Sequence, residues 1–143
     1  MIEFHDVYET PEALEVLYRL MQERSEEPQI NISHTGLPDY ADHCEFVASR
    51  PYYCWYLVRD GQWLGSVNVT MKNEIGIFLF RAFRGKRYGE QILRKLIAEV
   101  KPLTEVKSVR PGHFTANINP ENTRSIRLFE KIGFRHACNV YAL

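Results

Sequence analysis

The sequence predicts a mixed α/β fold built around an antiparallel sheet. Three stretches rich in β-branched and aromatic residues, at 52–59, 63–71 and 74–80, follow one another with only short turn-forming pairs between them. Apolar residues at helical spacing follow over 89–100. The three stretches indicate an antiparallel meander of strands, and the apolar stripe indicates a helix that packs on the sheet.

The first third of the chain predicts one strand and two helices. Residues 1–7 are expected to form the strand. Thr10 followed by Pro11 is typical of a helix start with Thr10 as the N-cap, and this helix is expected to run to about Glu23. After a loop, a second helix is expected over 39–49.

The last third predicts two more strands and one more helix. Residues 113–118 are expected to form a short strand, and residues 122–132 a helix that ends at Gly133. Residues 135–143 are expected to form a closing strand. With the helix over 89–100, the chain then has about four helices around its sheet.

Composition limits the class of protein. A chain of 143 residues with 45% hydrophobic residues is expected to form a single globular domain over 1–143. Its apolar stretches are shorter than the roughly 20 residues that span a membrane, and residues 1–10 lack the pattern of a signal peptide. The three cysteines have no CxxC spacing, which argues against a disulfide framework and a zinc site. We expect a cytoplasmic protein with no membrane partner and no metal.

The net charge of zero hides an asymmetry. Residues 1–50 hold eleven acidic residues and three arginines, whereas residues 51–143 hold fifteen basic and seven acidic residues. This pattern suits a protein with a cationic ligand on one side and a polyanionic ligand on the other. Nucleic-acid binding is disfavoured, because the basic residues gather at one loop and the overall charge is zero.

The loop "RGKRYG", from Arg84 to Gly89, lies between the last stretch of the meander and the helix that follows. The backbone N–H groups at a helix start are unpaired and carry about half a positive charge. Glycines allow an anion to come close to the backbone, and Arg84, Lys86 and Arg87 add formal charge. The loop therefore predicts an anion site, with phosphate as its ligand.

Two linked segments resemble the GNAT superfamily of N-acetyltransferases. "IGIFLFRAFRGKRYGEQILRKLI" is similar to its acyl-CoA-binding segment, and "ANINPENTRSIRLFEKIGF" to the segment that follows. The resemblance extends to the element order of nearly the whole chain. It implies a mostly antiparallel sheet that splays between strands 4 and 5, an acyltransferase that does not transfer aminoacyl groups, and acetyl-CoA as co-substrate.

The resemblance also implies the residues that bind the cofactor. The strand before the loop pairs with the pantetheine arm, the loop amides hold the pyrophosphate, an asparagine at the next helix contacts the cofactor, and a tyrosine beside the sulfur protonates the leaving thiolate. These positions are here Ile77, Phe78 and Leu79; Gly85, Lys86, Arg87, Tyr88, Gly89 and Glu90; Asn122; and Phe129. Two positions depart from the family. Its central loop glycine is Arg87, whose N–H remains usable if φ stays negative, and its tyrosine is Phe129, which has no proton to donate.

A general base has to remove a proton from the acceptor ammonium. Glu74 matches a position where family members place an acidic residue that faces the acceptor, although a solvated turn glutamate is an equal alternative. His34, near Asp39, is a second candidate in a loop. Asn117 is expected to orient the acceptor or to pair within a strand ladder. His43 is expected to pack in the core.

The aromatic run at 52–56 is expected to belong mostly to the core. Strand alternation would place Tyr53 and Trp55 on one face and Tyr52 and Tyr56 on the other, and one of these faces could stack on a sugar or nucleobase ring.

The function predicted from the sequence is direct transfer of acetyl from acetyl-CoA to a primary amine of a small molecule. An amino sugar or sugar nucleotide is the preferred acceptor. Two alternatives stay open: a protein or peptide N-acetyltransferase, and an acyl-CoA-binding module without catalysis. The sequence leaves the oligomeric state open, and a homodimer is one option.

Overall fold

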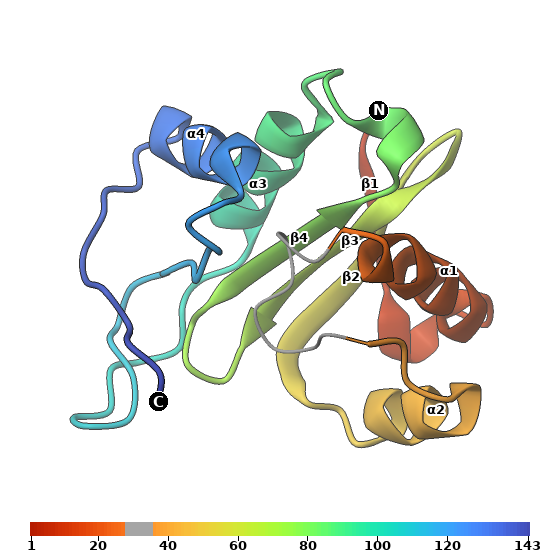
Figure 1. Cartoon of the computed structure of the whole chain (residues 1–143), viewed down its shortest axis with the longest axis horizontal. Coiled ribbons are helices and arrows are strands. Elements are labelled where there is room, and N and C mark those ends of the chain that lie inside the picture. Colours follow the sequence, from red (N-terminus) through yellow and green to blue (C-terminus); the bar gives the residue numbers. More distant parts are fainter. Residues whose placement is uncertain (28–35) are drawn as a thin grey trace.

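The computed structural model describes residues 1–27 and 36–143. These residues form one antiparallel sheet of strand order β1-β2-β3-β4, with helices packed on it (Figure 1). The predicted mixed α/β class is confirmed. The strands are β1 (Glu3–Asp6), β2 (Tyr52–Asp60), β3 (Gln62–Thr70) and β4 (Ile75–Leu79), and the α-helices are α1 (Ala13–Ser25), α2 (Tyr40–Ala48), α3 (Tyr88–Glu99) and α4 (Thr123–Lys131).

The predicted meander forms because tight turns join its strands. Gly61, with φ of 74°, lies between β2 and β3, and Asn73, with φ of 64°, lies between β3 and β4. The Asn73 side chain is fully buried. Its amide nitrogen donates to the carbonyl oxygens of Leu103 (3.0 Å) and Pro111 (2.8 Å), and its oxygen accepts from the N–H of Leu103 (2.8 Å). One turn residue thus fixes the long loop that follows α3.

The sheet separates two hydrophobic clusters. Figure 1 shows α3 and α4 on one side of the sheet and α1 and α2 on the other. The first cluster consists of Val58, Leu64, Val67, Val69, Ile75, Ile92, Leu93, Leu96 and Phe129. The second consists of Val7, Ala13, Val16, Leu17, Val47, Trp55 and Leu57. Alternation along the strands therefore gives both faces of the sheet a helix layer to pack against.

The helices agree with the sequence, except at the start of α1. Thr10 was predicted to be the N-cap, but its hydroxyl donates to the carbonyl oxygen of Asp6 (2.6 Å) instead of capping the helix. Helix α1 begins at Ala13. The fourth helix begins as expected after Asn122, whose side chain caps it by accepting from the N–H of Ser125. Across residues 1–27 and 36–143, every helix is too short or too polar to cross a membrane.

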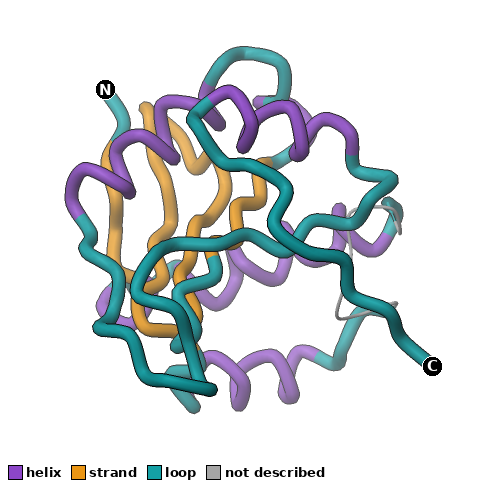
Figure 2. The backbone as a smooth tube through the Cα atoms, turned by 90° about the vertical axis from the view of Figure 1, so that its left-hand side faces the viewer, coloured by secondary structure: helices purple, strands orange, loops and turns teal. Residues whose placement is uncertain are grey.

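Two predicted strands do not form. Residues 113–118 make a single parallel bridge to the sheet, between Glu74 and Thr115, and are otherwise irregular. Residues 135–143 are irregular, and Figure 2 shows the chain ending as loop. A strand needs a continuous partner edge: residues 113–118 meet the sheet only at the bridge of Thr115, and residues 135–143 pair with no strand among the described residues. Tyr141 is 89% exposed, so the alternating residues of the tail have no sheet to pack on.

Candidate functional site

A pocket of about 720 Å³ surrounds the outer edge of β4. All four α-helices contribute to its wall, together with β2, β3 and the loop before α3. It brings together most of the residues that the sequence predicted. Those that line it are Glu74, Ile77, Phe78, Leu79, Arg84, Gly85, Arg87, Gly89, Glu90, Asn117, Asn122 and Phe129.

Three predicted residues are not part of this lining. The Lys86 ammonium lies 6.0 Å from the centroid of the Phe83 ring, outside the pocket. Tyr88 packs against the hydrophobic cluster between α3 and the sheet, and its hydroxyl lies 3.4 Å from a carboxylate oxygen of Asp60. His34 lies outside the described residues.

The strand β4 has one paired edge and one open edge. The N–H of Ile75 donates away from β3, to the carbonyl oxygen of Thr115 (2.8 Å). Alternate residues of a strand direct their backbone groups to the same edge. The backbone N–H and C=O groups of Ile77 and Leu79 therefore also point away from β3. Within the described residues, the bridge to Thr115 is the only pairing of that edge. Phe78 instead pairs its backbone with β3. Two of the three predicted strand residues can therefore pair with an extended ligand.

The start of α3 lines the same pocket as this open edge. Gly85 has φ of 74°, and an added Cβ there would meet nothing within 4 Å. Arg87 is the N-cap residue of α3, and its own side chain makes no capping hydrogen bond. The first N–H groups of α3 thus remain available for an anion, and the helix dipole favours one there.

The condition set for the Arg87 N–H, a negative φ, is not met: Arg87 has a φ of 66°, in the left-handed region. Glycine adopts this conformation at little cost, whereas other residues pay about 1–2 kcal/mol. Arg87 therefore adopts a backbone conformation that favours glycine, while adding a cation beside the helix start.

Glu90, in the first turn of α3, connects that helix to α4. Its carboxylate lies 3.0 Å from Lys131 and 3.0 Å from Arg94. The hydrogen bonds from Lys131 and Arg94 lower the pKa of Glu90. The negative charge of Glu90 is thus balanced by two cations, which limits its repulsion of an anion at the helix start.

Gly89 and Asn122 have structural roles at the contact between α3 and α4. A Cβ at Gly89 would lie 2.8 Å from a methyl carbon of Leu128, so this glycine allows α4 to approach α3 closely. The side-chain oxygen of Asn122 accepts from the N–H of Ser125 (3.2 Å) and caps α4. Both residues shape the pocket wall as well as lining it.

At the opposite end of the pocket, Glu74 is held by two neighbours. The Thr70 hydroxyl donates to one of its carboxylate oxygens (3.1 Å), and the Asn117 amide donates to the other in a short hydrogen bond. Asn117 therefore orients Glu74, rather than pairing in the ladder expected from the sequence. The arrangement presents a carboxylate in the pocket at a fixed orientation, as a general base requires.

Phe129 belongs mainly to the core. Its side chain is only 3% exposed, and its ring packs edge-on against Phe134, with the centroids 5.1 Å apart. It lines the pocket only with this small exposed part. The resemblance implied that this residue lies beside the thioester sulfur, but the Phe129 ring offers little exposed surface to such a ligand.

Several pocket residues were missed or misplaced by sequence reasoning. A register shift between Tyr52 and Cys54 breaks the alternation, so that Tyr52 and Trp55 line the pocket together, with ring centroids 4.7 Å apart. Tyr56 stacks on Phe4 on the other face. A bulge of this kind leaves no clear signal in the residue pattern.

Two further residues face the same end of the pocket. His43 was expected in the core and is only 2% exposed, with Nε2 2.9 Å from the carbonyl oxygen of Leu14, yet it also lines the pocket. Burial lowers the pKa of His43. Asn68 is 6% exposed and also lines the pocket. Alternation on β3 would have identified Asn68 as a polar residue between buried Val67 and Val69.

The described residues contain no group of three or more His, Cys, Asp and Glu side chains that could hold a metal ion. The three cysteines are free. Burial raises the pKa of Cys54 to about 11, so this thiol stays protonated at neutral pH.

The fold is shared with solved structures of low sequence identity. A domain from Methanocaldococcus jannaschii DSM 2661 has 24% identity and a TM-score of 0.72, over 96% of this chain and 90% of that one. The Campylobacter jejuni N-acetyltransferase PseH, solved with acetyl coenzyme A, has 15% identity and a TM-score of 0.67, over 98% and 92%. Spermidine N-acetyltransferase from Vibrio cholerae, solved with CoA and spermine, has 15% identity and a TM-score of 0.70, over 96% and 82%.

No curated protein matches the sequence. A family model does: the one described as the acetyltransferase (GNAT) domain matches residues 2–135. This match covers the sheet, the loop before α3 and all four α-helices, and it confirms the resemblance drawn from the two sequence segments. The chain belongs to the GNAT acetyltransferase family.

Proposed function

We propose that the protein transfers acetyl from acetyl-CoA directly to a primary amine of a small molecule. One observation carries the proposal: a single pocket joins the uncapped start of α3, the open edge of β4 and the carboxylate of Glu74. The first feature suits a pyrophosphate, the second an extended amide-containing arm, and the third an ammonium group. Their order along the pocket matches the order of these groups in an acetyl donor and its acceptor.

The open N–H groups fit the donor. The N–H groups of Tyr88, Gly89 and Glu90 begin α3 and would hold the pyrophosphate. Ile77 and Leu79 would pair with the pantetheine arm. When bound, acetyl-CoA supplies an activated acetyl group as a thioester.

The residues of the chain then have three tasks. Glu74 accepts a proton from the acceptor ammonium, directly or through water, so that the amine has a free lone pair. The N–H of Leu79 donates to the oxygen on which negative charge develops during the transfer. Since Phe129 has no proton to donate, protonation of the sulfur would be left to water or to the acceptor nitrogen as that nitrogen becomes an amide.

The acceptor end of the pocket suits a small cationic molecule with a flat or ring-shaped part. Glu74 and Asp42 provide negative charge, and Tyr52 and Trp55 provide an aromatic surface. An amino sugar or a sugar nucleotide has both features. This supports the acceptor class preferred from the sequence.

A screen of amines tests the proposal. Free thiol released from acetyl-CoA would be measured with amino sugars, polyamines, amino acids and a peptide with free amino groups. We expect turnover with a small amine and little with the peptide. Turnover with the peptide alone would favour the protein acetyltransferase, and binding of acetyl-CoA without turnover in a wide panel would favour a non-catalytic module.

A further inference from the structure

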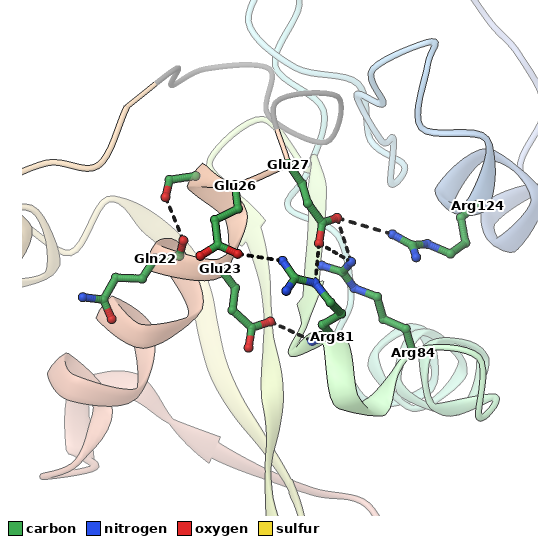
Figure 3. Close-up of polar contacts among 8 residues, drawn as sticks. Gln22, Glu23, Glu26, Glu27, Arg81, Arg84 and Arg124 are labelled. Carbon is green, nitrogen blue, oxygen red and sulfur yellow. Dashed lines mark hydrogen bonds and ion pairs between the residues drawn. The ribbon is translucent and has the colours of Figure 1, made fainter.

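Three arginines converge on the carboxylate of Glu27, which follows the C-terminal end of α1 (Figure 3). The Arg84 Nη1 atom lies 2.8 Å and 2.7 Å from the two carboxylate oxygens of Glu27. The Nε atom of Arg81 lies 3.0 Å from one of them. The Nη2 atom of Arg124, on α4, lies 3.8 Å from the other. The loop before α3 and the end of α1 thus share one ion-pair cluster.

Burial distinguishes one pair in this cluster. The side chains of Glu27 and Arg84 are each 14% exposed, whereas those of Arg81 and Arg124 are 52% and 58% exposed. Exposed pairs contribute little energy, but a buried charge has to be paired. Burial alone would raise the pKa of Glu27, and the hydrogen bonds from Arg84 and Arg81 outweigh it and lower the pKa. Glu27 and Arg84 therefore remain a charged pair.

The geometry leaves half of the Arg84 guanidinium for a ligand. Both oxygens of Glu27 contact the same nitrogen, Nη1. Within the described residues, the Nη2 and Nε atoms of Arg84 donate no hydrogen bond to a protein group. Arg84 lines the pocket, but Glu27 does not. Glu27 thus lies behind Arg84, as seen from the pocket.

We infer that Glu27 is a positioning residue: it holds Arg84 in the orientation in which Arg84 binds the phosphates of acetyl-CoA. This inference rests on the function proposed above. An arginine has five donors in a rigid fork, and fixing one nitrogen restricts where the others point. Arg84 held in this way offers Nη2 and Nε to a phosphate oxygen without first losing side-chain freedom. Glu27 also balances the repulsion among three neighbouring guanidinium groups.

The substitution Glu27→Gln tests this role because it keeps the size of the side chain and removes its charge. We expect the Kd of acetyl-CoA to rise about tenfold, since the charge-assisted bond that holds Arg84 is weakened. The Kd of S-acetylpantetheine, which lacks the phosphates bound at this end, is expected to stay unchanged, as is kcat at saturating acetyl-CoA. Glu26→Gln is the matched control, because the Glu26 carboxylate pairs with Arg81 rather than Arg84 among the described residues and is 65% exposed.

A double-mutant cycle adds a readout that does not depend on one variant. Arg84→Lys keeps the charge, but lysine has a single ammonium group and no second set of nitrogens for a phosphate. Adding Glu27→Gln to Arg84→Lys should therefore not raise the Kd of acetyl-CoA further. Equal losses for acetyl-CoA and S-acetylpantetheine would show a structural role only, and tighter binding of acetyl-CoA by Glu27→Gln would show that Glu27 competes with the phosphates. Either result overturns the inference. A wild-type protein that binds no acetyl-CoA would instead overturn the proposed function itself.

Discussion

The two ends of the pocket are built from different materials. At the α3 end, the groups offered to a ligand are mostly backbone: the first N–H groups of α3 and the open edge of β4. At the acceptor end, the groups offered to a ligand are side chains, for example those of Glu74, Asn68 and Trp55. A backbone site depends on chain shape, so it tolerates a new side chain that leaves this shape unchanged. A side-chain site changes its specificity with each substitution, which suits an acceptor that varies within a family.

The largest effect is expected at the side-chain end, from Glu74→Gln. The amide keeps the hydrogen bond from Thr70 but cannot accept the ammonium proton, so kcat/KM should fall by about 100-fold or more. The Kd of acetyl-CoA, measured by calorimetry, should hardly change, because Glu74 lies at the other end of the pocket. Near-normal turnover would assign the proton transfer to another group or to solvent.

A large effect on stability is expected at the backbone end, from Gly89→Val. The new side chain would enter the space held by Leu128, which a Cβ alone would approach to 2.8 Å. The free energy of unfolding should fall by about 3 kcal/mol, as measured by chemical denaturation. Gly85→Ala is the matched control, because a Cβ there meets nothing and the cost is only that of the left-handed backbone, about 1–2 kcal/mol. Equal losses would show that close packing of α3 and α4 is not the reason for Gly89.

A smaller loss is expected for Phe129→Tyr, which adds the hydroxyl that the family's tyrosine has. Because the ring is packed against Phe134, the hydroxyl lacks a partner, and the free energy of unfolding should fall by about 1–2 kcal/mol with no gain in kcat. Phe134→Tyr, at a partly buried ring, should lose less. A higher kcat would show that this ring reaches the sulfur after all.

The smallest effect is expected for Arg87→Gly. Relief of the left-handed backbone gains about 1–2 kcal/mol, and the added freedom of glycine in the unfolded chain costs about 0.5–1 kcal/mol, so a net gain of about 0.75 kcal/mol, the difference of the two midpoints, should appear as a higher Tm. Acetyl-CoA affinity should fall by only a few fold, because the backbone N–H groups remain. A loss of affinity far beyond this would make the Arg87 side chain itself a main phosphate ligand.

The sequence alone determined the features that depend on short-range patterns. Alternation and turn residues predicted the meander from β2 to β4, and apolar spacing predicted α3, because both signals lie within a dozen residues of the chain. The anion site at Arg84–Gly89 was predicted in the same way, from a strand, a glycine-rich loop and a helix in succession, and it remains a prediction. These signals failed for residues 113–118 and 135–143, where strand formation depends on a distant partner edge.

Only the tertiary structure decided which side chains meet in the pocket and directly behind its wall. The hydrogen bond from Asn117 to Glu74 and the pairing of Glu27 with Arg84 join residues 43 and 57 positions apart. The register shift next to Cys54 turns Tyr52 towards the pocket, and the packing of α4 on α3 buries Phe129. Such contacts arise from how whole elements pack, and packing sums many weak, long-range interactions that no local pattern encodes.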